Sequence, residues 1–389
     1  MNKPHKIAVY SGEIPSTTFI ERLVDGISKR GVKVYLFGLQ KKKKPYSHPN
    51  ICEVSHTENS FNKFFNLLKY SILLFFFRNK EKRKLEAFIK NHCTNHRRAR
   101  LKFYPVLYHR PDIFHIQWAK SISDWMWVQE FGIKLVLSLR GAHINYSPIA
   151  DPELAQTYRT YFPRLDGFHA VSEAIAREAQ HYGADPQKIQ VVYSGLTDLD
   201  AVFDKKPKNE VFEILSVGRS HWIKGYDYAL QAMQLLGDKK IDFNYTLIGG
   251  KGAEELEFLK ADLGLQDRVQ LLGNMPFEIV QQKMFQADVL LMPSVEEGIA
   301  NVVLEAMQLG TLVLTTDCGG MQEVIKDGKN GYIVPVRDPQ RMAEALEKIK
   351  LLSDSQKEAI RLEAQKTIAE IHSQEKMVTD MLTLYEKVL

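Results

Sequence analysis

The chain has 389 residues, of which 44% are hydrophobic and 25% are charged, values typical of a soluble globular protein with room for two domains. The net charge is +5, yet residues 1–200 contain 30 Lys and Arg against 18 Asp and Glu, whereas residues 201–389 contain 22 against 29. This split predicts two domains with different partners. Cys52, Cys93 and Cys318 are scattered, which excludes a disulfide framework and a thiolate metal site and suggests a reducing compartment.

A βαβ pattern opens the chain, with a strand, a helix and a second strand predicted at His5–Gly12, Thr18–Arg30 and Val32–Leu39. Because the first apolar run is short, it is typical of a strand rather than a signal peptide, and we expect a cytoplasmic protein. The βαβ opening favours a parallel, doubly wound sheet. Thr18 and Glu21 are predicted to form a capping box. The loop Ser11–Thr17 would lie where ligands bind in such sheets, but its single glycine, Gly12, matches a dinucleotide fingerprint poorly.

Residues 61–103 have an unusual composition. Residues 61–77 are apolar and aromatic, and residues 78–102 contain ten Lys and Arg against two acidic residues. The apolar run is too short to span a bilayer. One interpretation is a core helix followed by a solvated basic helix. Another is a surface, residues 61–102, that docks on anionic lipid. Nucleic-acid binding is the least favoured, because no nucleic-acid module accompanies the charge.

Four further strands complete the first domain, at Ile113–Gln117, Lys134–Leu139, Gly167–Val171 and Ile189–Tyr193. A helix is predicted at Ser172–Tyr182, with Ser172 as a good N-cap. Arg140 and His143 follow one of these strands at its carboxyl end and could face a ligand. For His143 a structural role is an equal alternative.

The polar and charged segment Asp198–Asn209 is interpreted as the interdomain linker. The alternation then restarts, with strands predicted at Phe212–Val217, Asn244–Ile248, Val269–Leu272, Val289–Met292, Leu312–Thr315 and Tyr332–Val336. The intervening helices are predicted at Tyr226–Leu236, Ala253–Leu263, Phe277–Gln286, Asn301–Leu309, Gly320–Ile325 and Pro339–Leu352. This run predicts a second βα domain.

Two loops of this second domain carry the chemistry. In the first, Gly218 permits a tight turn, and Arg219 and Lys224 supply two cations that could neutralise a diphosphate. In the second, Glu297 and Glu305 lie eight residues apart around a helix start. That spacing alone is close to chance, but helix starts favour anions such as phosphate, and a carboxylate on the next turn could bind neighbouring sugar hydroxyls. No metal-ligand cluster and no nucleophile elbow is visible.

These motifs resemble the retaining nucleotide-sugar glycosyltransferases of family 4. The resemblance rests on VGRSHWIKGYD at 217–227 and on PSVEEGIANVVLEAMQLGTLVLTTDCGGMQEVIKDGKNGYIVPV at 293–336, which contains an E-x7-E motif followed by G-G-x-x-E. It implies a GT-B fold, with two Rossmann-like domains that face each other across a cleft. Residues 1–200 would be the acceptor-side domain and 201–376 the nucleotide-sugar domain, and the helix 377–389 would pack back on the first.

The resemblance also implies roles for individual residues. Arg219 and Lys224 would hold the donor diphosphate, and Glu297 would contact the transferred sugar's hydroxyls. Glu305 would contact the ribose, and backbone near Asn274 and Met275 would contact the base. Further donor contacts are expected at Gly12, Arg140, His143, Gly218, Gly298, Ile299, Ala300 and Asn301. No metal and no other cofactor is implied.

The N-terminal sequence IPSTTFIERLVDGISKRGVKVYLF is similar to the branch that builds exopolysaccharide and other surface glycans. In that branch Ser16, Thr17 and Thr18 would lie on the acceptor side. One departure concerns the family's H-G-x-D motif, which here reads Arg140-Gly-Ala-His143. An arginine at this place could still support phosphate or sugar.

The implied function is hexosyl transfer, with retention, from a nucleoside diphosphate sugar to a glycan or lipid-linked acceptor in surface polysaccharide biosynthesis. Two other classes remain open: a GT-B enzyme that does not transfer, such as a nucleotide-sugar epimerase, and a non-catalytic nucleotide-sugar-binding protein. The expected location is cytoplasmic, with the basic aromatic segment 61–102 as a candidate for peripheral contact with the inner face of the membrane. No nucleic-acid partner is expected.

Overall fold

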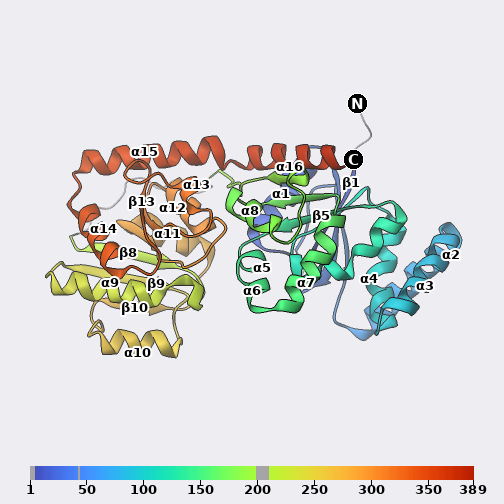
Figure 1. Cartoon of the computed structure of the whole chain (residues 1–389), viewed down its shortest axis with the longest axis horizontal. Helices are drawn as coiled ribbons and strands as arrows, with labels where there is room; N and C mark the ends of the chain where they lie inside the picture. Colours follow the sequence, from blue (N-terminus) through green and yellow to red (C-terminus); the bar gives the residue numbers. More distant parts are fainter. Residues whose placement is uncertain (1–4, 43, 199–209) are drawn as a thin grey trace. The chain divides into compact units, whose positions relative to one another are not determined.

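The computed structural model describes residues 5–42, 44–198 and 210–389, and these form two compact units (Figure 1). Unit 1 comprises Met1–Val171, Ala176–Gly195 and Gln374–Leu389, and unit 2 comprises Ser172–Ile175 and Leu196–Ser373. The helix α16 (Gln374–Val388) therefore belongs to unit 1 although it ends the chain. The expected linker Asp198–Asn209 lies, apart from Asp198, outside the described residues.

Unit 1 is built on a seven-stranded sheet whose paired strands are all parallel. Its strands are β1 (Lys6–Ile14), β2 (Lys33–Gln40), β3 (Ile51–His56), β4 (Ile113–Ile116), β5 (Lys134–Leu139), β6 (Gly167–Ala170) and β7 (Ile189–Val191). Their order is β3-β2-β1-β4-β5-β6-β7, a doubly wound arrangement. Strand β4 is buried along its whole length, which explains why three of its four residues are apolar; the fourth, His115, is buried with hydrogen bonds to Tyr385 and Ser138.

The helices of unit 1 are α1 (Thr18–Lys29), α2 (Ser60–Phe77), α3 (Asn79–His92), α4 (His96–His109), α5 (Ala142–Asn145), α6 (Ser147–Ala150), α7 (Pro152–Tyr161), α8 (Glu173–Gln180, whose first turn is grouped with unit 2) and α16. Short 3₁₀ turns lie at Ala119–Asp124, Met126–Phe131, Phe162–Arg164 and Pro186–Lys188. Helices α1 and α16 share one core cluster with the sheet. A side chain at Gly26 on α1 would overlap Val378 of α16, so glycine permits the two helices to approach closely.

Three expectations for unit 1 need correction. Helix α2 is not a core helix, because it buries only Tyr70 and Leu74. Thr18 and Glu21 form no capping box, because the N-cap is Thr17 and its side chain accepts no bond. The Glu21 carboxylate instead accepts from the Ser16 N–H at 2.7 Å. The expected loop Ser11–Thr17 is strand as far as the end of β1. The N-cap Ser172 is confirmed, since its hydroxyl accepts from the N–H of Ile175 at 3.2 Å.

Unit 2 contains a six-stranded sheet in the order β10-β9-β8-β11-β12-β13, also with parallel pairs only. Its strands are β8 (Phe212–Val217), β9 (Phe243–Ile248), β10 (Val269–Leu272), β11 (Val289–Met292), β12 (Leu312–Thr316) and β13 (Tyr332–Val334). Its helices are α9 (Tyr226–Asp238), α10 (Glu254–Asp262), α11 (Phe277–Gln286), α12 (Asn301–Gln308), α13 (Met321–Val324), α14 (Pro339–Leu351) and α15 (Asp354–Ile371), with a 3₁₀ turn at Trp222–Lys224.

Helices cover both faces of the unit 2 sheet. Along β8, Ile214 packs into the cluster that contains α9 and α14, whereas the next residue, Leu215, packs into the cluster that contains α12 and α15. Successive side chains of a strand point to opposite faces, so the apolar residues of β8 are buried on both faces, and Glu213 near its start is only partly buried.

In both sheets the strand order reverses direction beside the first strand, between β1 and β4 in unit 1 and between β8 and β11 in unit 2. The carboxyl ends of strands at such a switch point form the crevice in which doubly wound sheets bind ligands. These two edges position the candidate site residues described next.

Candidate functional site

The loop that follows β8 is tied closely to the loop that follows β11. Gly225 has a φ of +62°, and a side chain there would overlap the carbonyl oxygen of Pro293, so only glycine permits this approach. The Val295 N–H donates to the Ile223 carbonyl at 2.7 Å and fixes the two loops together. This contact turns Lys224 toward the second loop, whereas Arg219 is exposed at the start of the first.

Lys224 and Glu297 form an ion pair in this crevice. Their side chains are 22% and 18% exposed, so the pair is shielded from water but still reachable by a ligand. The Ser294 hydroxyl donates to the same Glu297 oxygen at 3.3 Å. Two of the three predicted catalytic residues, separated by 73 positions, are thus brought into direct contact. A charged group held by two partners loses little conformational freedom when it meets a ligand.

The start of α12 lies immediately after Glu297. The N-cap is Ala300, and in the described part of the chain no side chain caps the first turn, so the N–H groups of this turn are not engaged by a capping side chain. Gly320 donates its N–H to the Gly298 carbonyl at 2.8 Å, and a side chain at Gly319 or Gly320 would overlap the backbone of residues 297–298. The G-G pair thus holds the loop in the shape that presents the helix start.

The remaining residues of unit 2 that are expected to bind the donor lie on two elements, the helix α12 and the segment after strand β10. Asn301 opens α12, and its Oδ1 atom is buried with no hydrogen-bond partner among the described residues. Glu305 is half-buried one turn further, on the same helix face. Asn274 and Met275 follow the edge strand β10. Met275 packs on the same core cluster as Ile299, while Asn274 is exposed.

In unit 1 the expected acceptor-side residues lie at the end of β1 and the start of α1. Gly12 has a φ of +87° where the register of β1 and β2 shifts. Ser16 is held by Glu21, which also accepts from Tyr46 at 3.0 Å. Thr17 and Thr18 are exposed. The structure places them at the carboxyl edge of the sheet but gives them no contact with one another that would mark a binding site.

Arg140 occupies a partly closed position after β5. Its Nη2 donates to Gln117 Oε1 at 3.1 Å, and its guanidinium carbon lies 4.3 Å from the centre of the Phe19 ring. Burial lowers the pKa of Arg140, yet the guanidinium remains protonated at neutral pH, because arginine titrates far above it. Its Nε and the Nε2 of Gln117 are buried without a hydrogen-bond partner among the described residues. At the β1/β4 switch point the guanidinium of Arg140 and the side-chain amide of Gln117 thus each keep a buried N–H donor without a partner in the described part of the chain.

His143 lies beside the same position, with its ring centre 5.3 Å from that of Trp118. Burial, with a smaller contribution from Lys120, lowers the pKa of His143 to about 4, so the ring is neutral at pH 7. Its Nδ1 is buried and has no partner in the described part of the chain. Trp118 donates to the Ser11 carbonyl at 3.0 Å, which connects this corner to the end of β1.

A buried polar chain lies behind Arg140 and was not expected from the sequence. A carbonyl can only accept, so His169 Nε2 donates to Val192 O at 3.0 Å and His169 Nδ1 must accept from the Ser138 hydroxyl at 2.8 Å. Ser138 then accepts from His115 Nε2 at 2.8 Å. His115 Nδ1 is left to accept from the Tyr385 hydroxyl of α16 at 2.8 Å. These protons are inferred from the bonding pattern rather than observed.

Both histidines of this hydrogen-bond network, His115 and His169, are neutral at physiological pH. Burial, followed by the charge of Arg140, lowers the pKa of His115 to about 3 and that of His169 well below its ordinary value. Ser138 also lies 3.3 Å from Gln117 Oε1, the atom that binds Arg140. Ser138 has a single proton, which it donates to His169, so the network packs beside the Gln117–Arg140 pair and is not hydrogen-bonded to it. Sequence reasoning missed Gln117 and Trp118, although both directly follow β4, where a search at strand ends would have found them.

Comparison with known proteins gives the same picture over nearly the whole chain. The family model described as "Glycosyltransferase Family 4" matches residues 16–198, and that described as "Glycosyl transferases group 1" matches residues 200–367. The chain belongs to glycosyltransferase family 4. The expected resemblance to this family is thereby confirmed, and the curated relatives described next come from the surface-glycan branch.

Two curated relatives come from that branch. The putative colanic acid biosynthesis glycosyltransferase WcaL of Salmonella typhimurium is 27% identical over 240 residues, 59% of each chain. The amylovoran biosynthesis glycosyltransferase AmsK of Erwinia amylovora is 30% identical over 212 residues, 51% of this chain and 52% of that protein. The chain thus spans between half and three fifths of the length of these relatives.

Solved structures show the fold. The Anabaena protein HepE, solved in complex with UDP-glucose, aligns over 98% of this chain and 100% of its own with a TM-score of 0.71 and 17% identity. Together with the two parallel-sheet units, this likeness confirms the predicted GT-B fold.

Proposed function

We propose that this family 4 protein is a retaining hexosyltransferase that moves a sugar from a nucleoside diphosphate sugar to a hydroxyl of a glycan or lipid-linked acceptor in surface polysaccharide biosynthesis. The observation that carries the proposal is the switch point of unit 2. There the Lys224–Glu297 pair adjoins the uncapped start of α12, and Arg219 is exposed on the loop that contains Lys224. Cations and helix-start amides stabilise a departing diphosphate, and a carboxylate suits sugar hydroxyls.

In the proposed reaction the bond between the sugar's anomeric carbon and the diphosphate oxygen breaks, and a bond to the acceptor oxygen forms on the same face. The acceptor hydroxyl proton passes to the departing diphosphate, so charge balances without an added base. Arg219, Lys224 and the amides of Gly298–Asn301 stabilise the negative charge that develops on the leaving group. Glu297 orients the sugar and is not a nucleophile. Glu305 binds the ribose, and residues near Asn274 bind the base.

The unit 1 corner is proposed to take part in donor binding. Buried polar atoms without partners are rare in folded proteins and require an explanation such as a ligand or a water molecule. Such atoms occur on Gln117, Arg140 and His143. Arg140 supplies a positive charge there, and neutral His143 supplies a hydrogen-bonding nitrogen. No step of this mechanism uses a metal ion.

A donor-binding experiment tests the proposal first. Thermal unfolding is measured with UDP-, GDP- and ADP-sugars, starting with UDP-glucose, the ligand of the HepE structure, because a bound ligand stabilises the native state. NMR of the stabilising donor, with and without glycan acceptors, then shows whether the product keeps the donor's anomeric configuration. A donor that changes without an acceptor would indicate an epimerase, and binding without any turnover would indicate a non-catalytic protein.

Variants locate the chemistry. Arg219→Ala and Lys224→Ala should each lower kcat by about 10²–10³-fold, the cost of removing one charge-stabilising group from a transition state. Lys366→Ala on α15 removes an exposed cation from the same unit and should leave kcat unchanged. Near-normal turnover in both loop variants would refute the assignment of the site.

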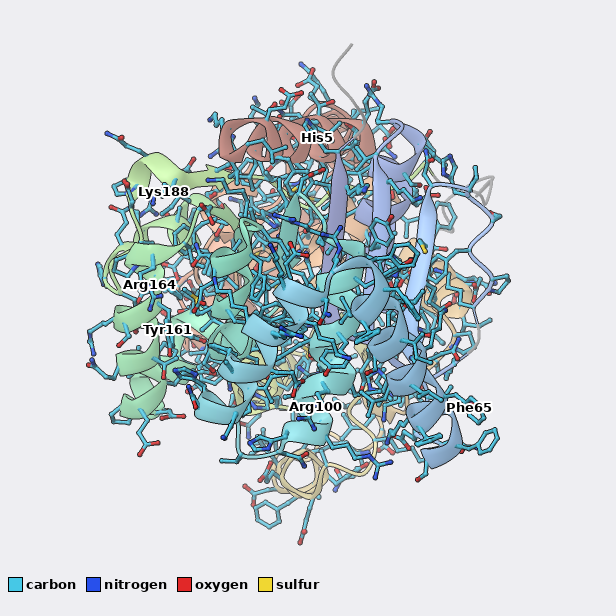
Figure 2. All side chains as sticks on the ribbon, turned by 90° about the vertical axis from the view of Figure 1, so that its right-hand side faces the viewer. His5, Phe65, Arg100, Tyr161, Arg164 and Lys188 are labelled. Carbon is cyan, nitrogen blue, oxygen red and sulfur yellow. The ribbon has the colours of Figure 1, made fainter. Side chains whose placement is uncertain are left out.

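We also propose that the protein works at the inner face of the cytoplasmic membrane, bound peripherally through α2. Eight of the seventeen large hydrophobic side chains that the described residues expose lie on this one helix: Phe61, Phe64, Phe65, Leu68, Ile72, Phe75, Phe76 and Phe77. Phe61, Phe65, Leu68 and Ile72 follow helical spacing and form one stripe. Figure 2 shows the side of unit 1 that bears Phe65. None of the described helices has the combination of length and apolar character that crossing a bilayer requires.

An anionic bilayer suits the surroundings of this stripe. Helix α3 begins two residues after α2 and contains five Lys or Arg side chains against two glutamates. Apolar anchors beside basic residues are the pattern of interfacial binding to anionic lipid.

Liposome sedimentation tests the membrane proposal. The protein should sediment with phosphatidylglycerol-containing vesicles and less with pure phosphatidylcholine vesicles. Replacement of Phe76 and Phe77 by serine should abolish sedimentation. The control Phe258→Ser removes a side chain that is 69% exposed on α10 of unit 2, against 74% for Phe76, and should not affect it. Equal, negligible binding of the wild type to both vesicle types would refute the proposal and leave a protein partner as the occupant of α2.

A further inference from the structure

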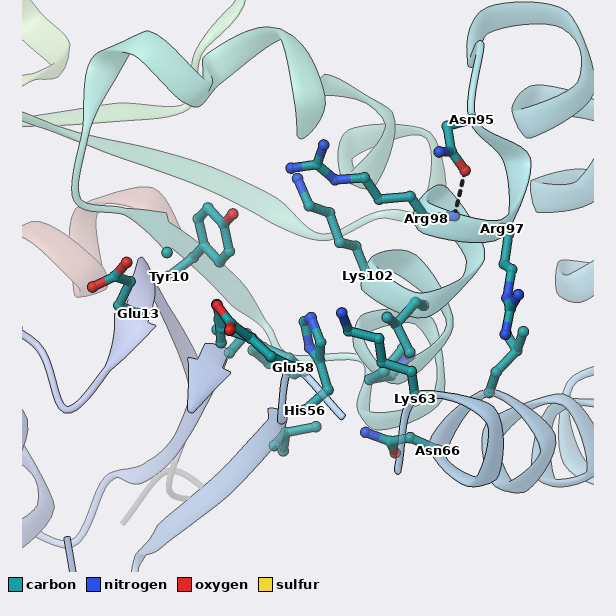
Figure 3. Close-up of a pocket in the computed structure, with 18 of the residues that line it drawn as sticks. Tyr10, Glu13, His56, Glu58, Lys63, Asn66, Asn95, Arg97, Arg98 and Lys102 are labelled. Carbon is teal, nitrogen blue, oxygen red and sulfur yellow. Dashed lines mark hydrogen bonds between the residues drawn. The ribbon is translucent and has the colours of Figure 1, made fainter. Parts of the chain in front are cut away.

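Unit 1 contains a pocket of about 810 Å³ that the proposed mechanism does not use (Figure 3). Its floor is formed by the carboxyl ends of β1, β2 and β3, and its walls by α2 and α4, as shown by the lining residues Gly12, Leu39, His56, Lys63 and Lys102. The pocket is therefore at the ligand-binding edge of the sheet but on the β1–β3 side, away from the Arg140 corner at the β1/β4 switch point.

The charges that line this pocket are unbalanced. Lys63 from α2 and Arg97 and Arg98 from α4 line it, and none of the three side chains has an ion-pair partner among the described residues. Lys102 also lines it and is paired with Asp124 at 3.2 Å. Glu58 also lines the pocket, and the pKa of its carboxyl is lowered chiefly by its hydrogen bond to Lys41 and in smaller part by the positive charge of Lys63. Arg97 and Arg98 are therefore the lining cations without a counter-charge in the described part of the chain. The lining still carries more positive than negative charge, an arrangement that favours the binding of an anion.

The acidic residues of the pocket are engaged mainly with Lys41 and neutralise the pocket's own cations only in part. Glu58 is 3.1 Å from Lys41 Nζ, and Glu13 is 3.8 Å from the same nitrogen. Lys41 does not line the pocket, so it draws both carboxylates toward its own side. The pKa of Lys41 is raised and that of Glu58 is lowered, chiefly through their mutual hydrogen bond, as expected for carboxylates already neutralised by a cation.

The orientation of the cations is consistent with a single anion. In Figure 3 the side chains of Arg98, Lys102 and Lys63 point into the same space, across from Glu13, whereas Arg97 lies on the far side of it. His56 lies between them and the strand ends, and its pKa is lowered by burial and then by the positive charges of Lys63 and Lys102. His56 is thus neutral at pH 7 and does not compete with the cations for an anion.

Helix α2 connects this pocket to the apolar surface. Lys63, Asn66 and Leu67 line the pocket at i, i+3 and i+4. At 100° per residue, Phe65 and Ile72 fall on the opposite face, where their side chains are 49% and 47% exposed. One helix therefore separates a basic cavity from a surface suited to lipid.

We propose that this pocket binds the phosphate group of the acceptor through Lys63, Arg98 and Lys102, so that the acceptor is a phosphate-bearing saccharide. The inference rests on the proposed transferase function, whose acceptor it specifies. The phosphate could belong to a lipid-linked saccharide, with its chain directed toward the bilayer at α2, or to a soluble phosphorylated glycan. Phosphate is the group that clustered lysine and arginine side chains bind most effectively.

Direct binding tests the pocket without knowledge of the acceptor. Isothermal titration calorimetry is performed with three probes, namely farnesyl diphosphate, inorganic diphosphate and farnesol. Farnesyl diphosphate should bind and farnesol, which lacks the charge, should not. Tighter binding of farnesyl diphosphate than of inorganic diphosphate indicates a lipid-linked acceptor, and equal binding indicates a soluble one. Absence of binding by both phosphate probes would overturn the proposal.

Variants decide where the probe binds. Lys63→Glu and Arg98→Glu should each weaken diphosphate binding by about tenfold or more, because each replaces a charge-assisted bond by repulsion. Both side chains lack ion-pair partners in the described structure, so the fold should tolerate the change. The matched control Lys90→Glu reverses an exposed charge on α3 outside the pocket and should have no effect. Unchanged affinity in both pocket variants would overturn the proposal.

The same set of proteins separates this inference from the proposed function. A diphosphate could also bind at the donor site of unit 2, so Lys224→Ala is titrated in parallel; loss of binding in this variant alone would overturn the pocket assignment. Lys63→Glu and Arg98→Glu should keep the thermal shift that the donor sugar produces in the wild type. If the wild type shows no donor shift with any nucleotide sugar, the proposed function fails, whatever the pocket binds.

Discussion

The hydrogen-bond chain from Tyr385 to His169 predicts a large effect from the loss of a single oxygen atom. In Tyr385→Phe the aromatic ring keeps its place in the core cluster of unit 1, and only the hydroxyl that donates to His115 Nδ1 is removed. His115 cannot turn to find another donor, because its Nε2 is bonded to Ser138. The variant thus leaves one fully buried acceptor without a partner.

The magnitude follows from that unpaired nitrogen. A buried polar group that loses its only partner costs roughly 1–3 kcal/mol, and the volume change is a single oxygen, so no cavity term adds to it. Because domains of this kind are stable by only about 5–15 kcal/mol, a loss of this size is easily measured. It should appear in unit 1, since α16 is part of that unit.

Urea unfolding at pH 7.5 provides the assay. Three of the four tryptophans, Trp118, Trp125 and Trp127, belong to unit 1, so tryptophan fluorescence reports mainly on its unfolding. Tyr385→Phe should lower the midpoint at unchanged slope. The control Tyr161→Phe removes a hydroxyl that is not hydrogen-bonded in the described structure and should change the free energy of unfolding by less than about 0.5 kcal/mol. An equally small change in Tyr385→Phe would refute the proton assignment of the chain.

Three further predictions follow from other parts of the structure. The folded-state pKa of His115, about 3, lies below its ordinary 6.5, so its contribution to stability is complete above pH 6.5 and is lost as pH falls toward 3. Burial lowers the pKa values of His109, His143 and His169 in the same way, so the free energy of unfolding from urea titrations should decrease below pH 6.5 by at least about 1.4 kcal/mol per pH unit, the share of one such histidine. A flat profile between pH 7 and 5 would contradict this. Gly225→Ala should destabilise unit 2 by roughly 1–3 kcal/mol and weaken donor binding, because the new methyl group would overlap Pro293 at a positive φ; Gly252→Ala, with φ +81° but open space around it, should cost less in thermal melts. Glu297→Gln should keep the fold and lower kcat by about 10²-fold in the transfer assay, with wild-type turnover as the contradicting result.

The sequence was sufficient for the architecture because both sheets are buried on both faces. Most of the parallel strands are short, mainly apolar runs separated by amphipathic helices, so strands and helices could be told apart by their periods. The two loops at the unit 2 switch point were found for the same reason, since each follows a strand end. The edge strand β3 (Ile51–His56) was not predicted, because only one of its six residues is buried and its sequence is not an apolar run. The contact between Lys224 and Glu297 could not be predicted from the sequence, because it depends on the close approach of two loops that Gly225 permits.

The parts that could not be predicted involve contacts between distant segments. Residues from β4, β5 and β6, the residue after β7 and Tyr385 of α16 make up the histidine network, and nothing local in sequence distinguishes Ser138 or His169 from other core residues. The role of α2 was open because an apolar run has the same composition whether its face meets the core or the outside. In the structure α2 buries only Tyr70 and Leu74, which shows that it is not a core helix.

The basic excess of the first 200 residues has two different explanations in the structure. Some of the cations hold α3 and α4 together: Arg100 of α4 binds Glu86 of α3 through its Nε and Nη2, and Arg110, directly after α4, binds Glu81 of α3 at 2.7 Å. These cations are already paired with carboxylates and would contribute little to the binding of a ligand.

Arg98 of α4 and Lys63 of α2 have no ion-pair partner among the described residues. The basic segment predicted from the sequence is therefore not simply solvated. Some of the basic residues behind the charge asymmetry are thus paired within the fold, whereas Arg97 and Arg98, which line the pocket, have no ion-pair partner among the described residues. A phosphate-bearing acceptor would neutralise cations left unpaired in this way, which gives the asymmetry between the two units a physical reason.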